Sequence, residues 1–292
     1  MTALLDVPAP AKLNLFLHIT GRRSDGYHLL QSVFMLIDWC DSLDFELRPT
    51  SAISREDLTT ALPDDDLIVR AARLLQTHTG CTHGAHIRVR KSIPAQAGMG
   101  GGSSDAASTL LALNRLWKLE LDRTSLARLG LQLGADVPFF VHGDNAWVEG
   151  VGERITPISL PPARFVVVKP PSGLETARIF SDPLLKRDTE PATIYGFAAN
   201  TFGFGRNDLQ AVAQRLSPDV NQALAWLSDK GLQPRMTGSG SAVFAHLPHE
   251  VDFSDAPAAF EVRVCSNVGV HPLQGWASGN GLSVGSANCQ PV

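Results

Sequence analysis

The chain has 292 residues, of which 44% are hydrophobic and 18% charged, a balance that is ordinary for a folded enzyme of one large or two moderate domains and excludes a disordered chain. Its 29 acidic and 25 basic residues give a formal charge of -4, so no global basic field exists to hold nucleic acid or an anionic membrane. The four cysteines form no C-x-x-C pair, and neither a secretory leader nor a membrane-length apolar stretch is recognisable, so we expect a cytoplasmic protein.

The first strong pattern is KLNLFLHI, residues 12–19, which alternates along its length. A period of two predicts a half-buried strand, with four aliphatic residues on one face and Lys12, Asn14, Phe16 and His18 on the other. A single lysine on such a face is usually only solvated. The pattern alone therefore leaves the role of Lys12 open.

A turn, a helix and a short strand follow in chain order. The dipeptide Asp25-Gly26 marks a turn, after which an apolar run reaches Ile37. Segment 66–76 has apolar residues at the helical interval with arginines outside, which predicts a packed helix. Segment 85–91 alternates as a short strand, and Pro94 ends it.

A glycine-rich loop joins this strand to a second helix. We expect the helix over 104–118, with Ser103 or Ser104 as its N-cap. A further helix is expected over 125–134, where a glycine stops it. We then expect Asp136 in a tight turn at a junction between elements, because its neighbour Val137 precedes Pro138 and the residue before a proline avoids the helical region.

The second half of the chain begins after the proline-rich segment 157–162, which is the predicted linker. The run RFVVVK after it predicts the first strand of a second domain. Later patterns predict helices over 207–216 and 221–231 and strands over 242–247 and 259–266. We therefore expect domains at 1–160 and 161–270, and a loose tail rich in glycine, serine and asparagine at 271–292.

The loop AGMGGGSSDAAS, residues 97–108, is the clearest functional signal. Glycine loses more conformational freedom on folding than any other residue, so the cluster indicates that bare backbone must approach something closely. A glycine loop at a helix N-terminus presents unpaired N–H groups and the positive end of the helix dipole, which together make a phosphate site without net positive charge. No Gly-Lys pair occurs in the chain, which excludes a P-loop, and Ser103 occupies a glycine position of the dinucleotide fingerprint. A tight turn with close helix packing remains the alternative.

Four segments carry a family resemblance: PAKLNLFL, IPAQAGMGGGSSDAAS, GADVPFF and MTGSGSAVFA. Their order and separations resemble the motif set of the GHMP kinase superfamily, and the similarity extends from Pro10 to about Val270. Within that superfamily, AKLNLFLHITGRRSDGYHLLQSVF resembles the branch that acts on a cytidine diphosphate-linked methylerythritol.

The resemblance implies both a fold and a reaction. The implied fold is α+β with two domains: an N-terminal ribosomal-protein-like α/β domain with a left-handed βαβ crossover, and a C-terminal ferredoxin-like domain. The active site would lie in the cleft between them. The implied reaction is the phosphorylation, by ATP with Mg²⁺, of the 2-hydroxyl of 4-diphosphocytidyl-2-C-methyl-D-erythritol in the non-mevalonate isoprenoid route. The implied partner is this small molecule, and the resemblance implies no obligate protein partner.

The resemblance also implies the residues of phosphoryl transfer, a reaction that needs the phosphates held, the developing charge met and the hydroxyl aimed. Asp136 matches the family's catalytic aspartate, which takes the hydroxyl proton, and Lys12 matches the lysine beside it, which stabilises the alkoxide. Loop amides would hold the phosphates, and the Ser104 hydroxyl would reach a phosphate oxygen or Mg²⁺. The implied ATP-binding residues are Asp66, Lys91, Pro94, Ala95, Gln96, Ala97, Gly98, Met99, Gly100, Gly101, Gly102, Ser103 and Ser104.

Asp66 and Lys91 lie near the implied adenine site. The family commonly has an asparagine where this chain has Asp66, so a contact to the base there is either altered or supplied by the backbone. Lys91 aligns with a lysine near adenine, although a lysine at a strand end is usually solvated.

For the second substrate, the resemblance assigns Tyr27 and His28 to the cytidine end, where an aromatic face stacks and a ring pairs with the edge of the base. Phe180 would form the opposite aromatic wall, and Asn14 would contact the erythritol hydroxyls. Core packing is the alternative for Phe180, and a plain hairpin turn is the alternative for the loop 238–241. The implied substrate-binding residues are Asn14, Tyr27, His28, Asp136, Phe180, Gly238, Ser239 and Gly240.

Three other interpretations remain open. Another GHMP kinase, acting on homoserine, mevalonate or a sugar, is opposed by the DGYH segment. In a noncatalytic nucleotide sensor, a pair formed by Lys12 and Asp136 would have no evident function. A zinc module has donor side chains close in sequence, but no second cluster completes a familiar spacing; its residues would be His78, Cys81, His83 and His86.

Overall fold

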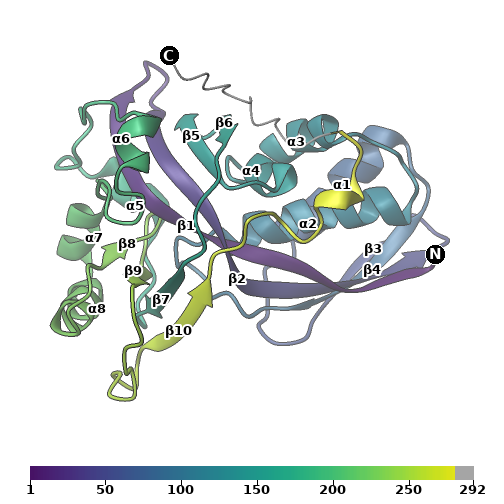
Figure 1. Cartoon of the computed structure of the whole chain (residues 1–292). Coiled ribbons are helices and arrows are strands. Elements are labelled where there is room, and N and C mark those ends of the chain that lie inside the picture. The colour runs from purple at the N-terminus through teal and green to yellow at the C-terminus, as the bar shows by residue number, and fades with distance from the viewer. Residues whose placement is uncertain (280–292) are drawn as a thin grey trace, which may run out of the picture.

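The computed structural model describes residues 1–279, which form two β-sheets with helices packed on their outer faces (Figure 1). The larger sheet contains β1 (Ala3–Arg22), β2 (His28–Arg48), β3 (Ile53–Asp57), β4 (Gly84–Arg90), β5 (Ala146–Gly150) and β6 (Arg154–Pro157). Its helices are α1 (Leu67–Thr79), α2 (Gly101–Leu116), α3 (Arg123–Leu131) and α4 (Val137–His142). The smaller sheet contains β7 (Arg164–Lys169), β8 (Arg235–Met236), β9 (Val243–Leu247) and β10 (Glu261–Ser266). The later helices are α5 (Thr176–Ser181), α6 (Ile194–Ala198), α7 (Gln210–Leu216), α8 (Pro218–Asp229) and the 3₁₀ turn η1 (Gln274–Trp276).

The two sheets have different topologies. The larger has the order β3-β4-β2-β5-β6, and β1 pairs antiparallel with β2. Strands β3 and β4 run parallel and are joined through α1, whereas the other pairs are antiparallel. The smaller sheet is antiparallel with the order β10-β7-β9-β8, which puts its first and third strands in the centre, as in a ferredoxin-like unit. Residues 248–260, between β9 and β10, contain no helix, so only the first crossover of that unit is helical.

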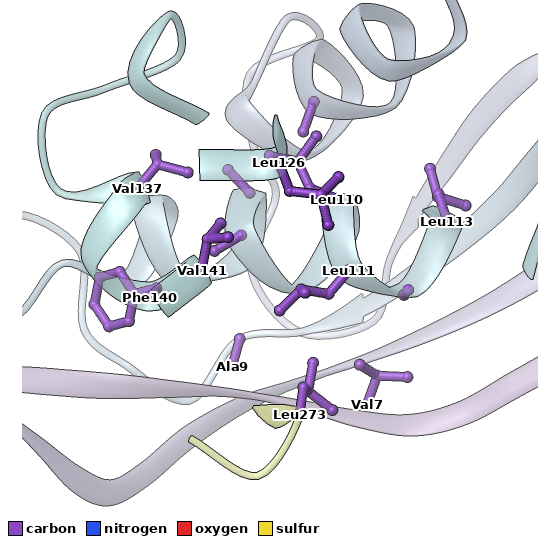
Figure 2. Close-up of a cluster of buried hydrophobic side chains, with 14 of the residues drawn as sticks. Val7, Ala9, Leu110, Leu111, Leu113, Leu126, Val137, Phe140, Val141 and Leu273 are labelled. Carbon is purple, nitrogen blue, oxygen red and sulfur yellow. The ribbon is translucent and has the colours of Figure 1, made fainter. Parts of the chain in front are cut away.

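The molecule has four layers, in the order helices, larger sheet, smaller sheet, helices, and buried apolar side chains fill the space between them. Strand β7 illustrates how one strand contributes to two of these cores, because its successive side chains point to opposite faces of the sheet. Phe165 and Val167 pack in the core between the sheets, whereas Val166 and Val168 pack in the core that contains α7 and α8. Figure 2 shows the remaining core, where Leu110 and Leu111 of α2 meet α4, β1 and the C-terminal Leu273.

Strand β1 differs from the predicted half-buried strand in length and in burial. The expected length was eight residues, whereas β1 extends from Ala3 to Arg22. Its second face is not solvated, because Lys12 is only 3% exposed and Asn14 only 1%. A register shift between Asn14 and Leu17 also breaks the alternation, so that Phe16 packs in the core between the sheets together with Leu13 and Leu15.

Helix α2 begins earlier than expected. Its first residue is Gly101, and Gly100 occupies the N-cap position with φ +73° and no side-chain cap. The prediction that Ser103 or Ser104 caps this helix was therefore wrong, because both lie inside its first turn. Asp136 directly precedes α4, which confirms its place at an element junction, although α4 itself was not predicted. Strands β3, β5, β6 and β8, helices α5 and α6 and the 3₁₀ turn η1 were also not predicted.

The predicted linker lies between β6 and β7, while the division at residue 160 stays a prediction. The chain after β10 returns to the larger sheet and α2 (Figure 1): Val268 donates a backbone hydrogen bond to the carbonyl of Leu36 at 2.9 Å, and His271 to that of Gly143 at 2.7 Å. Leu273 is 2% exposed in the core. The start of the predicted loose tail, 271–279, is therefore packed, and its remaining residues, 280–292, lie outside the described part of the chain.

Candidate active site

Three cavities adjoin and form one groove. The first, of about 400 Å³, shares Gly98 and Gly100 with the second, of about 720 Å³. The second shares Ala135 and Phe180 with the third, of about 910 Å³. The groove thus leads from the glycine loop, past Asp136, to the aromatic residues around α5. Its size suits two extended ligands that meet in the middle cavity.

Backbone N–H groups at the glycine loop are free to bind an anion. Gly98 and Gly100 have φ of +72° and +73°, a conformation that favours glycine. The amides of Gly101, Gly102 and Ser103 have no hydrogen-bond acceptor within residues 1–279. They open helix α2, so free N–H groups and the positive end of the helix dipole point to the same place. A phosphate chain can be held here without a cationic side chain.

The second glycine loop, 238–241, packs directly against the first. A Cβ atom on Gly98 would lie 2.2 Å from the carbonyl oxygen of Thr237, and one on Gly238 would lie 2.5 Å from that of Gly98. The Ser241 amide also donates to the carbonyl oxygen of Gln96 at 3.0 Å. Both loops therefore need glycine for their mutual contact, and each positions the other beside the middle cavity.

We expect Gly98→Ala to raise the KM for ATP at least about tenfold, because strain at a left-handed position costs about 1–3 kcal/mol and the new methyl group also displaces the Thr237 carbonyl. Steady-state kinetics with varied ATP measure this. The matched control is Gly231→Ala, since Gly231 has φ +77° but nothing within 4 Å of its added Cβ. An unchanged KM in the Gly98 variant would contradict the role of this loop.

Lys12 and Asp136 face each other in the middle cavity, which both residues line. Lys12 Nζ lies 3.5 Å from Asp136 Oδ2, and the Asp136 side chain is 32% exposed. The ammonium group also lies 4.5 Å from the centroid of the Phe34 ring. A buried cation beside a solvent-accessible carboxylate can stabilise a negative charge that develops on an oxygen between them.

Neighbouring polar groups hold Lys12 in place. Its Nζ donates to Asn14 Oδ1 at 2.5 Å, and Asn14 Nδ2 donates to Ser32 Oγ at 2.9 Å. The Asn14 backbone amide donates to Thr237 Oγ1 at 2.9 Å, which connects β1 to the second loop. Sequence reasoning missed Ser32, which lies in β2, and Thr237, which directly follows β8, because a single hydroxyl residue carries no local signal.

Lys91 is not solvated, contrary to the usual behaviour of a lysine at a strand end. Its ammonium group pairs with both Asp41 and Asp105, and its side chain is 12% exposed. Burial opposes the charge on Lys91, but the two carboxylates outweigh it and raise the pKa of the amine. Burial also raises the pKa of Asp105 to about 7. This cluster lies in the wall of the first cavity, where Lys91 and Asp105 both contribute.

The Asp66 carboxylate makes two contacts that stabilise the fold. Its carboxylate caps α1 by accepting a hydrogen bond from the Val69 amide at 3.0 Å, and it pairs with Arg55 at 2.7 Å. Asp66 lines the first cavity together with most of the predicted ATP-binding residues. Ser103 and Ser104 do not line it, and the buried Ser104 hydroxyl has no partner within the described residues. The residues of the loop that line it are Pro94, Ala95, Gln96, Ala97, Gly98, Met99, Gly100, Gly101 and Gly102.

Aromatic side chains gather at the other end of the groove. The rings of His28 and Phe180 lie 5.0 Å apart between centroids, and Tyr27 is 64% exposed. All three line the third cavity, so the structure brings together the residues assigned to the cytidine end. His28 Nε2 accepts a hydrogen bond from Arg187 Nε at 3.0 Å. Sequence reasoning missed Arg187, since one arginine in an irregular segment is not distinctive.

The remaining predicted residues of the second loop, Gly238, Ser239 and Gly240, line the middle cavity with Asn14. Among residues 1–279, no three or more histidine, cysteine, aspartate or glutamate side chains are grouped so that they could hold a metal ion. His86, one of the four residues of the alternative zinc module, instead contacts Ser54 and Glu56. Within the same residues, no helix has the length and apolar character needed to cross a membrane.

Comparison with known proteins identifies the family. Residues 66–144 match the model for the GHMP kinases N terminal domain, and residues 193–261 match that for GHMP kinases C terminal. A protein of Albidiferax ferrireducens named 4-diphosphocytidyl-2-C-methyl-D-erythritol kinase is 67% identical over 98% of this chain and 100% of its own length. A protein of the same name from an Acidovorax species is 66% identical over 96% of this chain and 100% of its own length. The chain belongs to the 4-diphosphocytidyl-2-C-methyl-D-erythritol kinases.

This family is a branch of the GHMP kinases, so the chain is a small-molecule kinase that uses ATP. A crystal structure titled 4-(cytidine 5'-diphospho)-2C-methyl-D-erythritol kinase, 33% identical, matches with a TM-score of 0.73 over 91% of this chain and 98% of that chain. A homoserine kinase from Cytophaga hutchinsonii matches with a TM-score of 0.67 over 93% and 96%, but at 16% identity it shares the fold alone. The expected two-domain α+β GHMP kinase fold is confirmed.

Proposed function

We propose that the chain transfers the γ-phosphoryl group of ATP to the 2-hydroxyl of 4-diphosphocytidyl-2-C-methyl-D-erythritol, a step of the non-mevalonate isoprenoid route, in the cytoplasm. The single observation that carries this assignment is the position of the Lys12–Asp136 pair. The pair lines the middle cavity, which adjoins both the amide-rich loop and the aromatic end of the groove. A donor phosphate and an acceptor hydroxyl would meet at that pair.

Asp136 acts as the general base. Its carboxylate is accessible from the cavity and takes the proton from the attacking hydroxyl. Lys12 carries the compensating charge: its ammonium group stabilises the developing alkoxide oxygen, and Asn14 keeps that group directed into the cavity. Little further covalent chemistry is required, because phosphoryl transfer depends mainly on positioning and charge stabilisation.

The loop 94–104 and the start of α2 hold ATP. The free amides of Gly101, Gly102 and Ser103 donate hydrogen bonds to its phosphate oxygens, while the cavity beyond, lined by Asp66 and Lys91, takes the base. Mg²⁺ fits the donor chemistry present, since hydroxyl, carboxylate and phosphate oxygens are its preferred ligands. The Ser104 hydroxyl, which has no hydrogen-bond partner among residues 1–279, would hold it. When bound, the ion neutralises phosphate charge.

At the opposite end, Tyr27 and Phe180 provide aromatic faces for the cytosine ring, and His28 pairs with the edge of the base. The second glycine loop closes over the substrate diphosphate through Gly238, Ser239 and Gly240. Its contact with the first loop brings the two ligands together. Substrate orientation thus comes from both ends of one groove.

An acceptor panel tests the proposal. The protein is incubated with ATP, Mg²⁺ and either 4-diphosphocytidyl-2-C-methyl-D-erythritol, homoserine, mevalonate or galactose, and ADP formation is followed. We expect turnover with the cytidine substrate alone, and its loss when the metal is chelated. Turnover confined to another acceptor would overturn the substrate assignment, whereas full activity in chelator would remove Mg²⁺ from the proposal.

A further inference from the structure

The hydrogen bond between Arg187 and His28 fixes the chemical form of the imidazole. An arginine side chain has donors only and stays protonated in proteins. Because Arg187 Nε lies 3.0 Å from His28 Nε2, that nitrogen must accept, so it carries no proton. A neutral imidazole protonated at one nitrogen then has its proton on Nδ1. His28 is therefore held as the Nδ1–H tautomer.

Arg187 is itself held in place by hydrogen bonds, so its contact with His28 is maintained. Its Nη1 donates to the carbonyl oxygen of Leu185 at 2.9 Å, and its Nη2 donates to those of Phe180 and Asp182 at 3.1 and 2.9 Å. The guanidinium group thus spans the end of α5 and the turn after it. It cannot rotate away from His28 without breaking these bonds.

The surroundings of His28 also disfavour its protonated form. Burial lowers the pKa of the imidazole, and the nearby cations Arg187 and Arg22 lower it further. No hydrogen-bond acceptor for Nδ1–H exists among residues 1–279, although His28 lines the third cavity. The ring therefore offers a ligand in that cavity one fixed donor, beside the face of Phe180.

A fixed N–H donor distinguishes the two common pyrimidines. The ring atom N3 of cytosine is a bare acceptor, whereas N3 of uracil carries a proton and is a donor. A donor facing uracil N3–H leaves both groups unpaired, which costs more than the absence of a favourable contact. We propose that Arg187 is a specificity-determining residue, which acts through the tautomer of His28 to select a cytosine over a uracil base. This inference rests on the proposed cytidine site.

Nitrogen NMR of the whole protein tests the tautomer directly. In ¹⁵N-histidine-labelled protein, the signals lost in His28→Gln identify the ring, and we expect its Nδ1 to be protonated and its Nε2 bare near pH 7.5. In Arg187→Met, we expect the two tautomers to mix, because Nε2 loses the donor that Arg187 supplies. A wild-type ring protonated at Nε2 would overturn the proposal without reference to any variant.

Kinetics test the consequence. The kcat/KM is measured for the cytidine substrate and for the same compound with uracil in place of cytosine. For Arg187→Met we expect about a tenfold lower kcat/KM with the cytidine substrate, equivalent to one hydrogen bond, and an equal or higher value with the uridine compound. A parallel loss on both substrates would show a merely structural role and overturn the proposal.

Arg215→Met is the matched control. Arg215 Nη2 pairs with Asp182 Oδ1 at 2.7 Å, so its loss loosens the same turn without touching His28. We expect its ratio of cytidine to uridine kcat/KM to equal that of the wild type. If the wild-type protein does not turn over the cytidine compound, the proposed function fails; if it does and Arg187→Met keeps the wild-type ratio, only the present inference fails.

Discussion

Asp136→Asn is expected to lower kcat by about two to four orders of magnitude, the usual contribution of a positioned general base. An amide has nearly the same shape as the carboxylate but cannot take the hydroxyl proton. Asp136 precedes α4 without capping it through its side chain, so the exchange removes no structural hydrogen bond of that helix. The KM values for ATP and the cytidine substrate should change little, and single-turnover kinetics would place the loss in the chemical step.

The control for this variant is Asp188→Asn. The Asp188 side chain is 87% exposed and lies 4.0 Å from Lys186, so its exchange should leave kcat unchanged. Thermal unfolding of both proteins checks that the fold is intact. Wild-type turnover in a folded Asp136→Asn protein would remove this residue from the mechanism.

Lys12→Met is expected to lower kcat by about two to three orders of magnitude, comparable with the loss of one charge-stabilising donor. Methionine keeps an unbranched apolar stem against Phe34 but cannot stabilise the alkoxide. It also leaves Asn14 Oδ1 without the donor seen at 2.5 Å, so we expect a lower melting temperature as well. Saturating kinetics at a temperature below the transition separate the two effects.

Lys186→Met serves as the control, because the Lys186 side chain is 53% exposed and reaches Asp188 only at 4.0 Å. Removing that charge should change neither kcat nor stability measurably. If Lys12→Met and Lys186→Met had equal turnover, charge stabilisation by Lys12 would be ruled out, and the 3.5 Å approach to Asp136 would have only a structural meaning.

Local patterns predicted several elements correctly. The helical interval in 66–76 corresponds to α1, and the run RFVVVK corresponds to β7, because both segments bury apolar side chains in a simple period. The same reasoning failed for β1, where a register shift turns Phe16 into the core between the sheets. On the other face, the Phe34 ring covers Lys12, and Ser32 and Thr237 cover Asn14. The burial of these β1 side chains depends on residues from other parts of the chain that pack against the strand.

Some features of the candidate site were likewise predictable from local sequence, and others were not. Four ordered motifs predicted the family, and the glycine run predicted an amide-lined anion site, because backbone conformation follows from local composition. The partners of those motifs were not predictable: Ser32 behind Asn14, Thr237 between the loops, and Arg187 on His28 each come from a distant part of the chain.

The sequence by itself determined which groups are present: a flexible glycine backbone at a helix start, a carboxylate in a turn, and an aromatic pair after a second turn. Only the tertiary structure decided what those groups can do. The charge next to Asp136 depends on the approach of Lys12 from β1, and the donor that His28 offers depends on Arg187. Electrostatic energy and hydrogen-bond direction depend on distances between atoms in space, and separation along the chain does not determine those distances.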